Sequence, residues 1–238
     1  MQTIKPDWSA PKHVQAFATT RIGGFSHSPF HSLNLALHVG DDPQSVAQNR
    51  QLMVDEFNLP NEPKWLNQQH TTNVKTDEKN FNELPYDGIY TRKKQQVCVV
   101  MTADCMPLLM TDKNGTEVAA VHAGWRGMAN GIIEKTMSLF AADPSDLLVW
   151  AGPTISQPNF EIGPEVKTAL GGSDYYYKEN LQRLNHYYCD LYGLASERVK
   201  QAGASYTQSD ACTYANENEY FSYRRDGKTG RMASFIWF

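Results

Sequence analysis

The stretch VCVVMT, at residues 97–102, predicts the centre of the fold. It is apolar up to its final threonine and rich in β-branched residues, a pattern typical of a strand that is buried on both faces. Two more apolar runs follow, PLLMT at residues 107–111 and VAAV at residues 118–121, with the turn residues DKNG between them. An Asn-Gly pair between apolar runs favours a hairpin. We therefore expect hairpin strands at the heart of the molecule.

Outward from this region, the sequence predicts helices mixed with further strands. Asp42-Pro43 is typical of a helix start, with Asp as the N-cap and Pro at the first helical position. Hairpins among mixed elements favour mixed β-sheets in an α/β or α+β fold, which we expect to be one domain over residues 1–238. The expected strands are residues 14–20, 64–68, 72–76, 89–91, 147–151, 220–224 and 232–237, and the expected helices are residues 43–57, 127–142, 164–170 and 184–202.

Composition excludes several classes of function. The chain has 238 residues, 41% of them hydrophobic, and a net charge of −4, so no basic face for nucleic acid is expected. The N-terminus lacks the apolar core of a secretory signal, and no stretch reaches the roughly 18 apolar residues that span a membrane. Four scattered cysteines without a CxxC pair indicate free thiols in a reducing compartment. The sequence thus predicts a cytoplasmic protein without a nucleic-acid or membrane partner. GxGxxG and Walker A segments are absent, so dinucleotide and P-loop binding are excluded.

Three residues that could bind a metal each lie at the end of an apolar run. They are His70, Cys105 and His122. Imidazole and thiolate suit zinc, with copper as the alternative, and three protein ligands leave a fourth position open, which is typical of catalytic sites. The competing interpretation is a buried cysteine and two hydrogen-bonded histidines, and the spacing of the three residues does not decide between them.

Glycines flank Trp125-Arg126 directly before an expected helix. Gly124 and Gly127 permit close backbone approach, and free N–H groups at a helix start favour an anion. The Arg126 guanidinium is suited to phosphate or carboxylate. A plain strand-to-helix turn with a solvent-exposed arginine explains the same residues.

A series of segments then occurs in one order along most of the chain. The segments are TTRIGG (19–24), SLNL (32–35), GDD (40–42), NR (49–50), DG (87–88), ADCMP (103–107), HAGWRG (122–127), GP (152–153), CT (212–213), SYRRDG (222–227) and GR (230–231). Together they resemble the bacterial YfiH-type family, which carries the labels polyphenol oxidase or laccase, purine nucleoside phosphorylase, adenosine deaminase and peptidoglycan editing factor. The resemblance runs from about Val14 to the C-terminus.

The resemblance implies a layered sandwich of mixed β-sheets flanked by helices, with His70, Cys105 and His122 as the metal ligands. One position departs from the family pattern: the first histidine is usually followed by glycine, and here Thr71 follows it. The resemblance also suggests Arg21 as a phosphate-binding residue, and Arg126, Arg224 and Asn34 are further candidates to bind phosphate or substrate.

Two reactions of purine nucleosides fit such a site. Phosphorolysis would convert adenosine, inosine or methylthioadenosine into the free base and ribose 1-phosphate. Deamination would use a zinc-activated water on adenosine, and Asp104 is the adjacent candidate to move protons. The expected partners are a purine nucleoside and phosphate, and the protein is expected to be a monomer or small homo-oligomer.

Three other functions remain open at this stage. Cys105 paired with His122 would suit a thiol hydrolase or amidase that edits peptidoglycan precursors. A zinc ion could also stabilise a non-enzymatic ligand-binding protein. A single copper could support weak phenol oxidation, but a multicopper oxidase is excluded, because no two of the seven histidines lie two residues apart.

Overall fold

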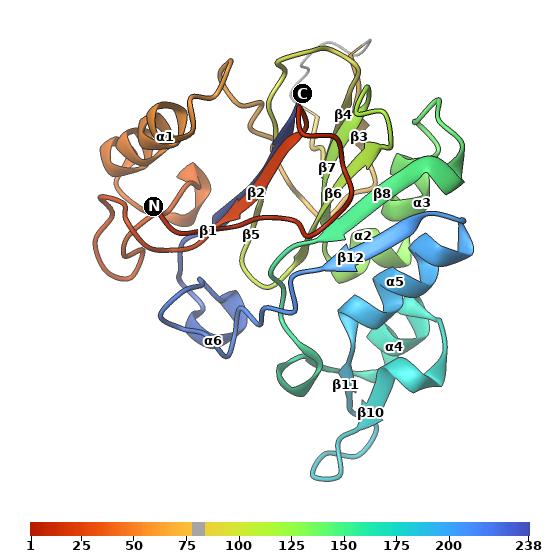
Figure 1. Cartoon of the computed structure of the whole chain (residues 1–238). Helices are drawn as coiled ribbons and strands as arrows, with labels where there is room; N and C mark the ends of the chain where they lie inside the picture. Colours follow the sequence, from red (N-terminus) through yellow and green to blue (C-terminus); the bar gives the residue numbers. More distant parts are fainter. Residues whose placement is uncertain (78–83) are drawn as a thin grey trace.

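The computed structural model describes residues 1–77 and 84–238. These residues form four layers, seen in Figure 1 from left to right as helix α1, a first sheet, a second sheet and a group of helices. The mixed α/β architecture predicted from the sequence is confirmed. Its layers place the strand ends of both sheets at one side, where the site described below is built.

The first sheet contains both ends of the chain. Its strand order is β1-β2-β13-β5, and each neighbouring pair is antiparallel. The register places Ser234 opposite Ala18 on one side and Val100 on the other. The predictions of strands at residues 14–20, 97–102 and 232–237 are thus confirmed. The bounds are β1 (Thr3–Ile4), β2 (Gln15–Thr19), β5 (Cys98–Thr102) and β13 (Met232–Trp237).

The second sheet is mixed. Its strand order is β12-β8-β6-β7-β4-β3, with β12 parallel to β8, β3 parallel to β4 and the inner pairs antiparallel. The expected hairpin joins β6 to β7, and Gly115 in its turn has φ 67°. The bounds are β3 (Val74–Lys75), β4 (Gly88–Thr91), β6 (Met106–Asp112), β7 (Val118–Ala123), β8 (Leu147–Ala151) and β12 (Ser205–Gln208).

Each sheet is buried on both faces, because side chains that alternate along its strands pack against a neighbouring layer on either side. Val100 and Ile236 of the first sheet pack against Leu109 and Trp150 of the second. The outer face of the first sheet packs against α1 (Pro43–Phe57), and the outer face of the second packs against α2 (Trp125–Ala129), α3 (Ile132–Met137), α4 (Pro164–Leu170) and α5 (Leu191–Gln201). Burial on both faces explains why the strands read as continuous apolar runs.

Helix α1 forms as predicted because its ends are specified locally. Asp42 accepts hydrogen bonds from the backbone of Ser45 at 2.9 Å and Gln44 at 3.4 Å, and Pro43 occupies the first turn. Asn58 ends the helix in the left-handed conformation, with φ 46°.

Two predicted helices are shorter in the structure. The helix expected at residues 127–142 is divided into α2 and α3 by Gly131, whose φ of 84° cannot continue a right-handed helix. The helix expected at residues 184–202 begins only at Leu191. Its first part is instead the strand β11 (Tyr187–Cys189), which pairs with β9 (Glu161–Ile162) and β10 (Tyr177–Glu179) in a small third sheet.

Two predicted strands are also wrong. Residues 220–224 lead into the short helix α6 (Tyr223–Asp226), whose N-cap Ser222 accepts from the Arg225 N–H at 3.2 Å. Residues 64–68 run beside the edge strand β5, but only Lys64 forms a regular bridge to it. Further along, the Gln68 side chain exchanges two 2.8 Å hydrogen bonds with the backbone of Met101. A side-chain amide thus replaces the backbone pairing that the pattern predicted.

No helix among the described residues is both long and apolar enough to cross a membrane.

Replacing Gly131 by Ala should lower the free energy of unfolding by about 1 kcal/mol, because a Cβ is strained in the left-handed conformation. Gly131→Asn should lose less, since asparagine tolerates that conformation. Urea unfolding followed by circular dichroism measures both. Equal stability of the Ala variant and the wild type would show that the break between α2 and α3 does not depend on this glycine.

Candidate active site

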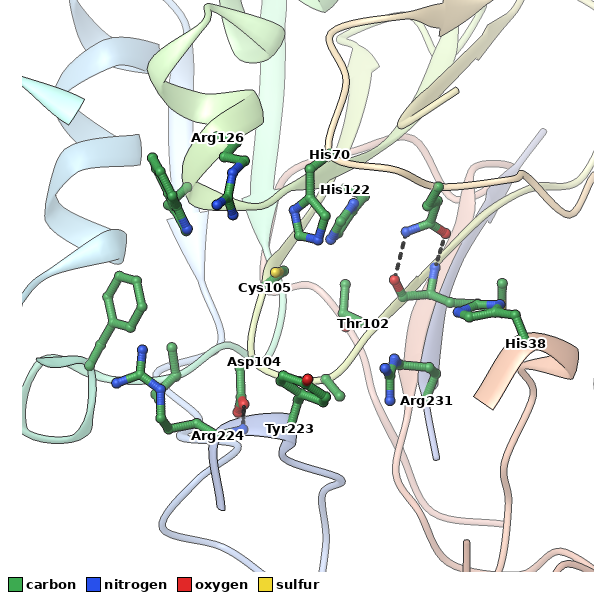
Figure 2. Close-up of a pocket in the computed structure, with 16 residues that line it drawn as sticks. His38, His70, Thr102, Asp104, Cys105, His122, Arg126, Tyr223, Arg224 and Arg231 are labelled. Atoms are coloured by element: carbon green, nitrogen blue, oxygen red, sulfur yellow. Dashed lines mark hydrogen bonds between the residues drawn. The ribbon is translucent and has the colours of Figure 1, made fainter. Parts of the chain in front are cut away.

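Pairing of β6 with β7 brings two of the three candidate ligands together. Pro107 lies opposite His122 in the register, so Cys105, two residues before Pro107, lies beside that histidine. His70 comes from the loop before β3. One ligand atom of each of the three residues lies within 4.8 Å of the others, and Figure 2 shows the three side chains converging. The structure therefore brings together the triplet that the sequence predicted.

A buried carboxylate fixes the orientation of His122. Asp87 lies 2.7 Å from Nδ1 of the imidazole, and its backbone oxygen accepts from the His122 N–H at 2.7 Å. An ionised carboxylate can only accept, so Nδ1 carries the proton. In the neutral imidazole, Nε2 then carries the lone pair that a metal would bind, as in carboxylate–histidine–metal arrangements.

The same contacts shift the pKa values of both groups. Burial by itself lowers the pKa of His122, but the charges and hydrogen bonds of Cys105 and Asp87 outweigh it and raise this pKa to about 9. Burial raises the pKa of Asp87, but its hydrogen bonds from His122 and Thr71 outweigh that effect, and the pKa lies below its usual value. For His70, burial and the neighbouring His122 lower the pKa, so its imidazole is neutral at pH 7.

The surroundings of the triplet fit a metal ion. A Cβ at Gly124 would lie only 2.5 Å from His70 Nδ1 and 3.2 Å from Cys105 Sγ. Glycine therefore leaves space that any other residue would fill. Two imidazoles and a thiolate are donors that zinc and copper prefer. Within residues 1–77 and 84–238, this is the one group of His, Cys, Asp or Glu side chains that could hold such an ion.

A cavity of about 490 Å³ opens above the triplet, a volume in the usual range for small-molecule sites. Figure 2 shows side chains from several elements pointing into it. They combine cationic groups with aromatic rings. Besides the triplet, the lining residues are His38, Gln68, Met101, Thr102, Ala103, Asp104, Trp125, Arg126, Ile155, Phe160, Tyr223, Arg224 and Arg231.

Two of the predicted anion-binding residues lie in this lining, and two do not. Arg126, in the first turn of α2, lies over the Trp125 ring, 4.2 Å from its centroid. Arg224, in α6, donates to the Glu161 backbone oxygen at 2.9 Å. Arg21 instead donates to the backbone oxygens of residues 31 and 217 and lines a separate hollow. Asn34 is fully buried, and its side-chain amide forms hydrogen bonds with the backbone of Ala36, the Asp41 carboxylate and the Arg231 N–H.

Asp104 lies at the cavity wall with both carboxylate oxygens engaged. One oxygen accepts from the Thr213 hydroxyl and the other from the Arg224 N–H, each at 2.7 Å. Its backbone has φ 88°, and its carbonyl oxygen accepts from Thr154 and Ile155. These bonds join three distant segments beside Cys105. They favour a positioning role, and proton transfer by Asp104 stays a prediction.

Sequence reasoning missed several residues of the site. Arg231 and Phe160 come from segments far apart in the chain and meet only in the fold. Asp87 was given no role, although the Asp87-Gly88 pair belongs to the series of family segments. Burial and the charges of Arg231 and Arg50 lower the pKa of His38, so this imidazole is neutral at pH 7.

Comparison with known proteins shows the family to which the chain belongs. The family model described as multi-copper polyphenol oxidoreductase laccase matches residues 15–238. A purine nucleoside phosphorylase of Haemophilus influenzae is 43% identical, and the match covers the whole of both chains. The purine nucleoside phosphorylase YfiH of Escherichia coli is 44% identical over 98% of both chains.

Solved structures agree with these sequence matches. A Neisseria meningitidis protein superposes with a TM-score of 0.92 at 38% identity, covering 100% of this chain and 99% of its own. The YlmD protein of Geobacillus stearothermophilus has a TM-score of 0.86 at 30% identity, over 95% and 92% of the two chains. The resemblance found in the sequence is thus confirmed, and the chain belongs to the laccase-like family that includes the YfiH proteins.

Proposed function

We propose that this protein is a purine nucleoside phosphorylase whose substrates bind in the cavity above Cys105. The observation that carries the proposal is the set of residues that line that cavity. They combine a potential metal-binding triplet, three guanidinium groups and aromatic rings around one volume of about 490 Å³. The names of the relatives from Haemophilus influenzae and Escherichia coli support the same reaction.

The three arginines supply the charge that phosphate needs. Arg126, Arg224 and Arg231 all line the cavity, and guanidinium groups bind phosphate oxygens with two parallel hydrogen bonds. In phosphorolysis, phosphate attacks the anomeric carbon as the bond to the base breaks. Holding phosphate and nucleoside together in the attacking geometry is a major part of the catalysis. Arg231 replaces Arg21 in our assignment, because Arg21 lines a different hollow.

The aromatic rings and His38 suit a purine base. Trp125, Phe160 and Tyr223 line the cavity with flat apolar surfaces against which a base can stack. A neutral His38 offers one donor and one acceptor to the edge of the base. The proposed substrates are adenosine, inosine and methylthioadenosine, and the products are the free base and ribose 1-phosphate (methylthioribose 1-phosphate in the last case).

The residues that would hold the metal are His70, Cys105 and His122. When bound, zinc at such a site acts as a Lewis acid and lowers the pKa of a water in its fourth position. Asp87 keeps the proton of His122 on Nδ1, and Gly124 keeps the space around the ligand atoms free. Zinc is our assignment, with copper as the alternative.

A second activity, deamination of adenosine, is favoured by the number of ligands. A triplet with one open coordination position is the arrangement that zinc hydrolases use. The same cavity would hold adenosine for both reactions. Full multicopper oxidation is not proposed, because the donor groups of the described residues suffice for one ion.

A thiol hydrolase is the competing function, favoured by the contact between Cys105 and His122. The two functions differ in their dependence on metal. A metal-free preparation that cleaves amide bonds, and stops doing so on alkylation of Cys105, would support the hydrolase.

Purified protein incubated with inosine should release hypoxanthine only when phosphate is present. Adenosine should give adenine with phosphate and inosine without it. Chromatography of the products distinguishes the two reactions. Absence of both products from zinc-loaded protein would contradict the proposed function.

Arg126→Gln should raise the KM for phosphate about tenfold, because one charge-assisted hydrogen bond contributes about 1.5 kcal/mol or more. The KM for the nucleoside should change much less. Arg92→Gln, an exposed arginine outside the cavity, is the matched control. Equal phosphate KM values for the two variants would move the phosphate site away from Arg126.

Zinc binding should depend on pH, because the ion competes with the proton that His122 holds below its pKa of about 9. Between pH 6 and 8, the association constant should rise about tenfold per pH unit, since each ion displaces at least one proton. Competition with a chromophoric chelator at several pH values measures this slope. A constant affinity over that range would show that the ion binds elsewhere.

A further inference from the structure

One buried carboxylate contacts both histidines of the proposed metal site. Asp87, directly before β4, is fully buried, and its Oδ1 accepts two hydrogen bonds. One comes from the His122 ring at 2.7 Å and the other from the His70 backbone N–H at 3.0 Å. A single oxygen therefore holds the ring of His122 in its orientation and the backbone of His70 in its position.

The second oxygen of Asp87 holds the loop on either side of His70. Oδ2 accepts from the Gln69 N–H at 3.2 Å, from the Thr71 N–H at 2.6 Å and from the Thr71 hydroxyl at 2.8 Å. The hydroxyl itself accepts from the Asn73 N–H at 3.1 Å, so its orientation is fixed as well.

The backbone of His70 requires such support. Its φ of 59° lies in the left-handed region, which a residue with a side chain rarely adopts unless its surroundings hold it there. The three backbone N–H groups of residues 69–71 reach Asp87 through this conformation. Loss of one of them would free the loop to relax and carry the His70 imidazole away from Cys105.

We propose that Asp87 and Thr71 form a clamp that orients His70 and His122 for a divalent metal ion. The two are positioning residues, since the cavity lining drawn from the described residues includes neither of them. Outer residues that orient metal ligands commonly change metal affinity 10–100-fold when they are replaced. The inference rests on the proposed metal site, and it assigns a role to the threonine hydroxyl in particular.

Thr71→Val tests the hydroxyl, because valine keeps the branched shape and removes the donor. We expect its Kd for zinc to rise about tenfold, at the lower end of the range for such residues. Thr71→Ser, which restores the hydroxyl, should stay within about twofold of the wild type. Thr72→Val is the matched control, because the Thr72 hydroxyl is not among the donors to Asp87.

Asp87→Asn tests the carboxylate more severely. An amide nitrogen cannot accept hydrogen bonds, so at least one set of donors loses its partner. We expect a Kd for zinc about 100-fold higher than that of the wild type. If this variant does not fold, the Thr71 variants decide the question alone.

Competition with a chromophoric chelator gives the zinc Kd of each full-length variant. Cobalt substitution adds a spectroscopic measurement, because the visible bands of cobalt respond to the geometry of its ligands. Thr71→Val should change those bands, whereas Thr71→Ser and Thr72→Val should retain the wild-type spectrum.

The outcomes separate the clamp from the site itself. Wild-type zinc affinity and an unchanged cobalt spectrum in Thr71→Val would overturn the proposed role of its hydroxyl. Zinc binding by the wild type that is unchanged in Cys105→Ser would instead overturn the metal site, whatever the Thr71 variants do.

Discussion

The structure depends most on the antiparallel pairing of β6 with β7. This pairing forms the middle of the larger sheet and also sets Pro107 opposite His122. A shift of one residue in that register would turn His122 to the other face of the sheet and separate it from Cys105. The core and the site are therefore fixed by the same backbone hydrogen bonds. Apolar side chains on both faces hold the register, so packing on each side of the sheet maintains the geometry of the triplet.

The His70 loop has the opposite character. It has little regular secondary structure, and polar contacts keep it in place. Asp87 connects it to β7, and Gln68 connects it to β5 of the other sheet. The third candidate ligand thus comes from a segment that is attached to both sheets without belonging to either. Sites often combine a rigid framework with a loop of this kind, because the loop can vary without loss of the core.

The sequence predicted those parts of the fold whose causes are local or periodic. Residues 97–102 were recognised because burial on both faces leaves a continuous apolar run, and α1 was recognised because Asp42 and Pro43 specify its start. The prediction at residues 184–202 was wrong because Tyr187–Cys189 takes its conformation from pairing with two strands distant in the chain. Gly131 is a further case, since its effect depends on a backbone angle that the helical pattern does not reveal.

For the site, the sequence identified the residues with distinctive chemistry but not those whose role depends on position. His70, Cys105 and His122 were found by their type, their strand ends and the family resemblance. Arg231 was missed because an arginine in a polar segment gives no indication of what it will face. The same reasoning explains Arg21, which the resemblance suggested and which the fold directs to another hollow.

The pairing of Gln68 with Met101 has a consequence for the behaviour of the protein at high concentration. β5 is the last strand of its sheet, and the unpaired backbone groups of an edge strand are a template for pairing with another molecule. The amide of Gln68 forms hydrogen bonds with both the N–H and the carbonyl oxygen of Met101, and the backbone of Lys64 pairs with β5 at Cys98. The segment that carries His70 to the site therefore also shields an aggregation-prone edge, so solubility and ligand placement depend on the same few residues.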